Sequence, residues 1–177
     1  GIARHSFRAS TQILINEGLL KREPHRGVEV ATLTAEDVAD IFRLRTALEV
    51  EAVRIVAESK AVPDQARDAT RSIASLANDA PWREVVWPDL RFHQAIVEAA
   101  ESPRLLRAYQ GLQSEILLCL IRLRPVDDSP AEIAGEHKAV LEAISAGDVE
   151  EAEKLIRLHL AEGAESLITL YLDRNRG

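Results

Sequence analysis

The sequence predicts a mostly α-helical protein, in which a bundle of six to seven helices follows a short helix and a β-hairpin. Two observations predict this fold. From residue 34 onward apolar residues recur every three or four positions, and no alternating strand pattern interrupts them. Prolines stand where helices would begin, and an Ala-Gly-Asp turn at 146–148 separates the last two helices. The 177 residues, 46% of them hydrophobic, are enough to bury a core.

The first part of the chain is expected to form one helix and two strands. Phe7, Ile13 and Leu14 are interpreted as the apolar anchors of the helix, and Gly18 as its stop. A turn rich in proline and glycine separates the two strands. The predicted elements are a helix over 3–17 and strands over 19–23 and 28–31.

The remaining chain predicts six helices. Thr34 is the expected N-cap of the first, since Glu36 and Asp37 follow it in the first turn. The apolar stripe of this helix is interpreted as Val38, Ile41, Phe42, Leu44, Leu48, Val53 and Val56. The later helices are expected over about 64–78, 81–100, 103–123, 130–145 and 148–172.

Charge is distributed unevenly along the chain. Residues 1–30 hold five Lys/Arg and three Glu, whereas the rest holds 17 basic and 26 acidic residues, so +2 and −9 make up the net charge of −7. Only the N-terminal part would therefore approach DNA favourably. The single cysteine, Cys119, is expected in the core and excludes an internal disulfide or a Cys-x-x-Cys zinc site. No apolar run approaches the ~20 residues that span a bilayer, and a reducing cytoplasm is the expected compartment.

Four residues predict a metal site in the bundle. Asp89 and His93 are four positions apart and therefore share one helix face. His137 and His159 flank the turn at 146–148 and would lie at nearly the same level on antiparallel helices, roughly 15 and 18 Å from it. Three imidazoles and one carboxylate suit a divalent transition ion, with zinc expected first and nickel or manganese also compatible.

Other functions fit the same residues. A metal-dependent hydrolase would use the ion to activate water, although no separate general base is evident. A structural helical bundle with incidental histidines is the third alternative. An Asp/His pair four apart on a helix is, by itself, more often a solvated surface pair than half of a metal site.

Two stretches resemble a known family. DLRFHQAIVEAAESPRL and EHKAVLEAISAGDVEEAEKLIRLHL are similar to the FCD-type ligand-binding domain of FadR-like GntR transcription regulators. The first stretch carries the family's D-x-x-F-H, and each of two later helices supplies one histidine around a Gly-Asp turn. The resemblance implies that the metal is held by Asp89, His93, His137 and His159.

The N-terminal stretch GIARHSFRASTQILINEGLLKREPHRGVEVA resembles the second half of a GntR winged helix-turn-helix. The chain is accordingly interpreted as a piece of a longer protein. Two domains are expected, a partial DNA-binding domain over 1–31 and a metal-, effector- and dimerisation domain over 32–177. Thr11 and Ser102 depart from the residues usual in the family, and neither is an expected ligand. The residues expected to contact DNA are Arg4, His5, Ser6, Arg8, Arg26 and Gly27.

Together these features predict a ligand-responsive transcription regulator that binds operator DNA as a homodimer. The resemblance implies a small organic acid as its effector, such as a hydroxy, sugar or dicarboxylic acid. An arginine near the metal would neutralise the carboxylate. The candidates are Arg45, which follows the family's pattern on the first long helix, and the weaker Arg122 and Arg124.

Overall fold

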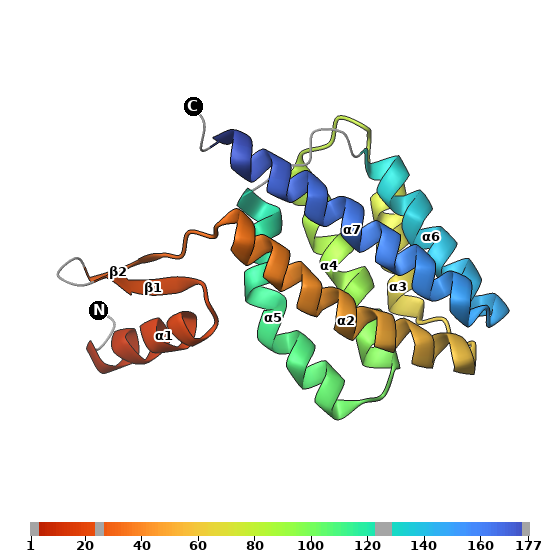
Figure 1. The fold of residues 1–177 in the computed structure, drawn as a ribbon, viewed down its shortest axis with the longest axis horizontal. Helices are drawn as coiled ribbons and strands as arrows, with labels where there is room; N and C mark the ends of the chain where they lie inside the picture. The colour runs from red at the N-terminus through yellow and green to blue at the C-terminus, as the bar shows by residue number, and fades with distance from the viewer. Residues whose placement is uncertain (1–3, 24–26, 123–128, 175–177) are drawn as a thin grey trace.

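The computed structural model describes residues 4–23, 27–122 and 129–174, and it confirms the predicted mostly α-helical fold (Figure 1). Within these residues, seven helices accompany one two-stranded antiparallel sheet. In chain order the elements are α1 Arg4–Asn16, β1 Leu20–Glu23, β2 Gly27–Val30, α2 Ala35–Ser59, α3 Asp64–Ala74, α4 Trp82–Ala99, α5 Pro103–Arg122, α6 Pro130–Ala146 and α7 Val149–Arg174. Among these helices, none is both long and apolar enough to cross a bilayer.

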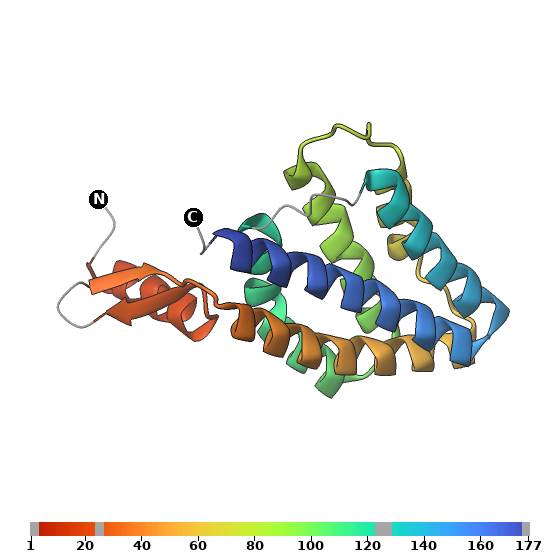
Figure 2. The same ribbon diagram turned by 45° about the horizontal axis from the view of Figure 1, so that its top comes forward.

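α1 and the hairpin lie together at one end of the bundle, beside the first turn of α2 (Figure 2). α1 stops as predicted, because Gly18 adopts the left-handed conformation at φ +73° that a side chain would disfavour. The strands pair from Leu20 opposite Val30 to Glu23 opposite Gly27. Leu19 and Ala31 pack against the core of the bundle, and the hairpin is therefore joined to the helices by apolar contact as well as by the chain.

The helix boundaries follow local capping chemistry. The Thr34 hydroxyl accepts a hydrogen bond from the Asp37 amide at 3.1 Å, and the Asp37 carboxylate accepts one from the Thr34 amide at 2.7 Å. Ser129 and Glu132 form the same reciprocal pair at the start of α6. Between α6 and α7, Gly147 is left-handed at φ +75°. These caps place the start of α2 and the turn between α6 and α7 where the sequence predicts them.

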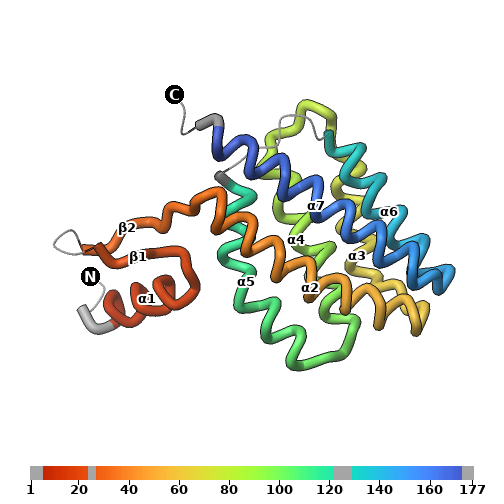
Figure 3. The backbone as a smooth tube through the Cα atoms, in the orientation of Figure 1, coloured from red at the N-terminus to blue at the C-terminus, as the bar shows by residue number. Residues whose placement is uncertain are grey.

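α2 and α7 run antiparallel side by side, and α4 lies in the middle of the bundle with α5 and α3 on either side of it (Figure 3). The core between them is apolar and includes fully buried Val53, Ile116 and Ile156. Cys119 is buried in this core, as predicted. α4 therefore carries its side chains into the centre of the molecule, where α2, α6 and α7 can meet them.

The predicted apolar stripe of α2 was wrong at one position. Leu44 is 49% exposed, whereas the neighbouring Arg45 is only 2% exposed. At 3.6 residues per turn, position 44 points about 120° away from Val38, while positions 45 and 49 lie within about 20° of it. The buried face of α2 therefore includes two charged residues, Arg45 and Glu49.

Two further expectations were wrong. Phe7 and Ile13 are 64% and 56% exposed, because α1 packs mainly against β1 within the described chain. The second bundle helix ends at Ala74 rather than near residue 78.

Thr11, which departs from the family pattern, donates its hydroxyl to the Phe7 carbonyl at 2.8 Å, a bond within α1 itself.

Candidate metal centre

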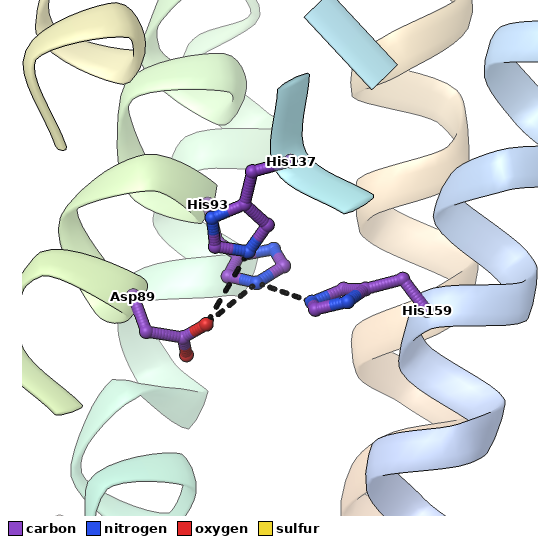
Figure 4. Close-up of side chains that lie close together, drawn as sticks. All are labelled: Asp89, His93, His137 and His159. Atoms are coloured by element: carbon purple, nitrogen blue, oxygen red, sulfur yellow. Dashed lines mark hydrogen bonds and ion pairs between the residues drawn. The ribbon is translucent and has the colours of Figure 1, made fainter. Parts of the chain in front are cut away.

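Three helices bring the four predicted ligands together in the middle of the bundle (Figure 4). Asp89 and His93 project from α4, His137 from α6 and His159 from α7. Each offers one ligand atom, and these four atoms all lie within 4.8 Å of one another. Spacing along the helices thus correctly predicted that the four side chains converge.

Two of the ring Nε2 atoms lie near one carboxylate oxygen, and the third faces one of these two nitrogens. Asp89 Oδ1 lies 3.6 Å from Nε2 of His93 and 3.4 Å from Nε2 of His137. Nε2 of His159 lies 3.1 Å from Nε2 of His93. Asp89, His93 and His137 are buried, and the side chain of His159 is 13% exposed. The cluster is therefore enclosed by protein on most sides, with His159 nearest to solvent.

Two of the histidines contact a glutamate carboxylate through Nδ1, the ring nitrogen that does not face the cluster. Nδ1 of His93 lies 2.5 Å from Oε2 of Glu49, and Nδ1 of His159 lies 2.6 Å from Oε2 of Glu136. Because a carboxylate only accepts hydrogen bonds, each Nδ1 must carry the hydrogen. In the neutral rings, both Nε2 atoms are then bare lone pairs that face each other at 3.1 Å.

His137 is held differently. Its ring stacks on Phe92 with centroids 3.7 Å apart and an angle of 4° between the planes. Neither of its buried ring nitrogens has a hydrogen-bond partner among the described residues. Burial lowers the pKa of His137 to about 3, although Asp89 opposes the shift. His137 is therefore a neutral imidazole, and its Nε2 faces the cluster at 3.4 Å from Asp89 Oδ1.

The charges buried around the cluster favour a cation. Arg45 donates from Nε to Oε1 of Glu49 at 2.7 Å, and both side chains are almost fully buried. Burial by itself would raise the pKa of Glu49, but His93 and Arg45 lower it to about 2. Burial would also lower the pKa of His93, yet Glu49 and Asp89 together outweigh this effect and the pKa lies above its ordinary value. The surroundings of His93 thus stabilise positive charge.

The residues fit a divalent metal ion. The facing Nε2 lone pairs of His93 and His159 need a positive charge between them, either a proton or a metal ion. Nε2 of His137 faces the same centre and has no hydrogen-bond partner among the described residues. For Asp89, burial would raise the pKa, but His93 and His137 hold it well below the ordinary value, so its carboxylate is ionised. Three neutral imidazoles and one carboxylate form a donor set typical of transition ions.

A small cavity adjoins the cluster and is lined by two of its members, Asp89 and His159. It holds about 50 Å³, room for a few water molecules. Arg45 also lines it, and Nη2 of this arginine has no partner among the described residues. The other lining residues are Phe42, Trp82, Leu120, Ile133, Glu136, Leu160, Glu162, Gly163 and Leu167.

The remaining predicted site residues are placed to different extents. Of the predicted effector residues, Arg45 reaches the cavity, Arg122 ends α5 without a described side chain, and Arg124 lies outside the described residues. Of the predicted DNA contacts, Ser6, Arg8 and Gly27 are exposed. Arg4 and His5 lie on α1 without described side chains, and Arg26 lies outside the described residues.

Glu49 and Glu136 belong to the site but were not predicted from the sequence. Glu49 follows Arg45 by four residues on the face of α2 that also carries Val38 and Val56, which indicates burial. Glu136 immediately precedes His137 but turns to His159 on the next helix. No spacing rule indicates this second contact.

Comparison with known proteins identifies relatives along most of the chain. The FCD domain family model matches residues 40–162. The "Probable D-xylose utilization operon transcriptional repressor" of Paenarthrobacter nicotinovorans is 29% identical over 165 residues, which cover 91% of this chain and 71% of that protein.

Solved structures share the fold. A GntR transcriptional regulator from Rhodococcus sp. RHA1 matches with a TM-score of 0.82 at 23% identity, over 96% of this chain and 82% of that one. A metal-free FCD domain matches with a TM-score of 0.67 at 19% identity, over 81% of this chain and 99% of that one. At these identities the structures show a common architecture.

Proposed function

We propose, from the premise that the chain belongs to the FCD domain family of GntR transcription regulators, that it couples a metal-bound small organic acid to the control of DNA binding. As a member of this family the protein is a regulator and not an enzyme, so the hydrolase alternative is set aside. The proposal assigns residues 32–177 to metal, effector and dimer contacts, and residues 1–31 to DNA, with the regulator acting in the cytoplasm.

The convergence of Asp89, His93, His137 and His159 on one point carries this proposal. A structural bundle has no need for three imidazoles and one carboxylate whose ligand atoms meet in the protein interior. Elemental analysis of the purified protein tests the site directly: one equivalent of zinc, nickel or manganese is expected. If the protein takes up none of these ions in titrations, the metal site is contradicted and the bundle has a purely structural role.

Charge balance supports a carboxylate as effector. Asp89, Glu49 and Arg45 bring a buried charge of minus one to the site. A divalent ion would change this sum to plus one, and a single carboxylate would neutralise it. Glu136 and Glu162 also line the cavity and would repel a second carboxylate. We therefore favour hydroxy or sugar monocarboxylic acids over the dicarboxylic acids that the sequence analysis left open.

Arg45 is the proposed contact for the carboxylate, because this residue lines the cavity and Nη2 of its guanidinium has no partner among the described residues. Arg45→Lys keeps a positive charge beside Glu49 but removes Nη2. A hydrogen bond to a charged group contributes roughly 1.5–3 kcal/mol. Calorimetric titration with a 2-hydroxy monocarboxylic acid should therefore show binding weakened by about tenfold or more, with metal content unchanged.

The matched control for this prediction is Arg43→Lys, at a side chain on the same helix that is 76% exposed and paired with Asp40. This variant should bind the acid like the parent protein. Equal acid affinity for both lysine variants would show that Arg45 does not contact the effector. Its ion pair with Glu49 would then be its remaining role.

α1 and the hairpin are the proposed DNA-binding surface. Ser6 and Arg8 are exposed on α1, and Gly27 is exposed at the start of β2. In winged helix-turn-helix proteins such a helix enters the major groove, and two copies in a dimer bind paired half-sites. We therefore propose a homodimer on a two-fold operator, with Arg4, His5 and Arg26 as further contacts on the same surface.

Arg8→Ala is expected to weaken operator binding by about 1–3 kcal/mol if the guanidinium contacts a base. Titration of labelled operator at one stated salt concentration measures this loss. Arg157→Ala, at an exposed arginine on α7, removes the same charge outside the proposed surface and should leave affinity nearly unchanged. Identical losses in the two variants would indicate a general charge effect rather than a contact by Arg8.

A further inference from the structure

Glu49 is an acidic side chain buried in the middle of the bundle, with only 2% of its surface exposed. It lies on α2, opposite the helix that carries two of the proposed metal ligands. Among the described residues, each of its oxygens has one hydrogen-bond partner: Oε1 accepts from Nε of Arg45 at 2.7 Å, and Oε2 faces Nδ1 of His93 at 2.5 Å. Burying a carboxylate costs several kcal/mol unless such partners satisfy it, so its position requires both contacts.

We propose that Glu49 is a positioning residue for metal binding, which acts by fixing the tautomer and the orientation of His93. This inference rests on the proposed metal function. Because the carboxylate can only accept, it keeps the hydrogen of His93 on Nδ1 and leaves Nε2 as a lone pair. Nε2 of His93 is the atom that faces the other ligands. It lies 3.6 Å from Oδ1 of Asp89 and 3.1 Å from Nε2 of His159. A ligating histidine needs this arrangement, since a protonated Nε2 cannot bind an ion.

Arg45 sets the direction of this chain of contacts. The guanidinium has donors only, so whatever stands at position 49 must present an acceptor to it. Glu49 has two acceptor oxygens and satisfies both Arg45 and His93. Arg45 on α2 thus requires an acceptor at position 49, and Glu49 in turn requires the hydrogen of His93 on α4 to be on Nδ1.

The two other histidines provide an internal comparison. Glu136 contacts Nδ1 of His159 in the same way, but its side chain is 42% exposed, so water can take its place. His137 has no acceptor at Nδ1 among the described residues and is oriented by stacking on Phe92. Among the three, His93 therefore depends most on its carboxylate, and substitution of Glu49 should weaken metal binding more than substitution of Glu136.

Glu49→Gln tests the proposal with almost no change of shape. Arg45 compels the new amide to present its oxygen to the guanidinium, which turns the NH₂ group toward Nδ1 of His93. His93 must then accept at Nδ1 and carry its hydrogen on Nε2, where the ion would bind. Zinc titration should show affinity lowered by roughly 10- to 100-fold. This is the range for replacing a group that hydrogen-bonds to a ligating histidine.

Glu51→Gln is the matched control, since it removes the same charge from an exposed position on the same helix. It should bind zinc like the parent protein. The double variant Arg45→Met with Glu49→Gln frees the amide to turn its oxygen toward His93. Zinc affinity should then recover at least partly relative to Glu49→Gln, which a merely structural role for the ion pair would not produce.

A direct measurement needs no zinc. In the metal-free parent protein, at a pH that keeps the ring neutral, ¹⁵N chemical shifts should show His93 protonated at Nδ1, and a folded Glu49→Gln variant should show it protonated at Nε2. Parent protein with the Nε2–H tautomer overturns the inference, even where Glu49→Gln does not fold. Equal zinc affinity of the Glu49→Gln and Glu51→Gln variants overturns it as well. If the parent protein binds no metal, the proposed function fails, while the tautomer measurement still decides whether Glu49 fixes His93.

Discussion

Metal retention is expected to be lost when His137 is replaced by alanine. This side chain is fully buried, and within the described residues its ring nitrogens have no hydrogen-bond partner, so a bound ion is the proposed use for its lone pair. The loss of metal affinity should exceed the roughly 10- to 100-fold expected when a residue hydrogen-bonded to a ligand is replaced. An ion at 100 times its dissociation constant stabilises a protein by about 2.7 kcal/mol. Thermal melting with and without chelator should show this increment in the parent protein and not in His137→Ala.

A matched core variant separates ligand loss from cavity formation. Val140 lies on the same helix and is 1% exposed, so Val140→Ala also leaves a cavity in the bundle. It should lower the melting temperature with and without metal but keep the increment that metal adds. His159→Ala should behave like His137→Ala. Unchanged metal content in both histidine variants would contradict the assigned site.

Much of the fold was predictable because local chemistry and packing agree along this chain. The prolines that begin α5 and α6 and the glycine after α6 mark boundaries that the structure reproduces. The level of the histidines was predictable for a related reason. Two antiparallel helices joined by a tight turn bring residues at equal distances from that turn together, and the rings of His137 and His159 are 4.9 Å apart.

The charged interior was not predictable by the same rules. Counting only apolar residues placed Leu44 in the stripe of α2 and left Arg45 out of it, whereas the structure buries Arg45 and exposes Leu44. Burial of Arg45 and Glu49 depends on His93, a partner 44 residues beyond Glu49. Hydrophobic periodicity carries no information on that contact. A polar pair four apart, in phase with the apolar face of a helix, is the only local indication.

The second large effect concerns the order of binding: a small carboxylate should bind this protein only when the metal is present. Without the ion, the cavity beside Asp89 and Glu136 is predominantly acidic, and Arg45 is already paired with Glu49. A carboxylate would enter against like charge. With the ion, it gains a cation and the Nη2 donor of Arg45. Titration of 2-hydroxy monocarboxylic, sugar and dicarboxylic acids should therefore show binding with metal and none after chelation, with the monocarboxylic acids bound most tightly.

The same acid should alter operator affinity, because α2 joins the two ends of the molecule. This helix starts directly after the hairpin and carries Arg45 into the cavity, so a shift at Arg45 moves an element attached to the proposed DNA-binding surface. Linkage requires that operator DNA change the affinity for the acid by the same factor, whatever the sign of regulation. Arg45→Lys should reduce the effect of the acid on operator binding, and Arg43→Lys should preserve it. If the acids bound chelated and metal-loaded protein equally well, the ion would have a structural role and would not be the point at which the effector binds.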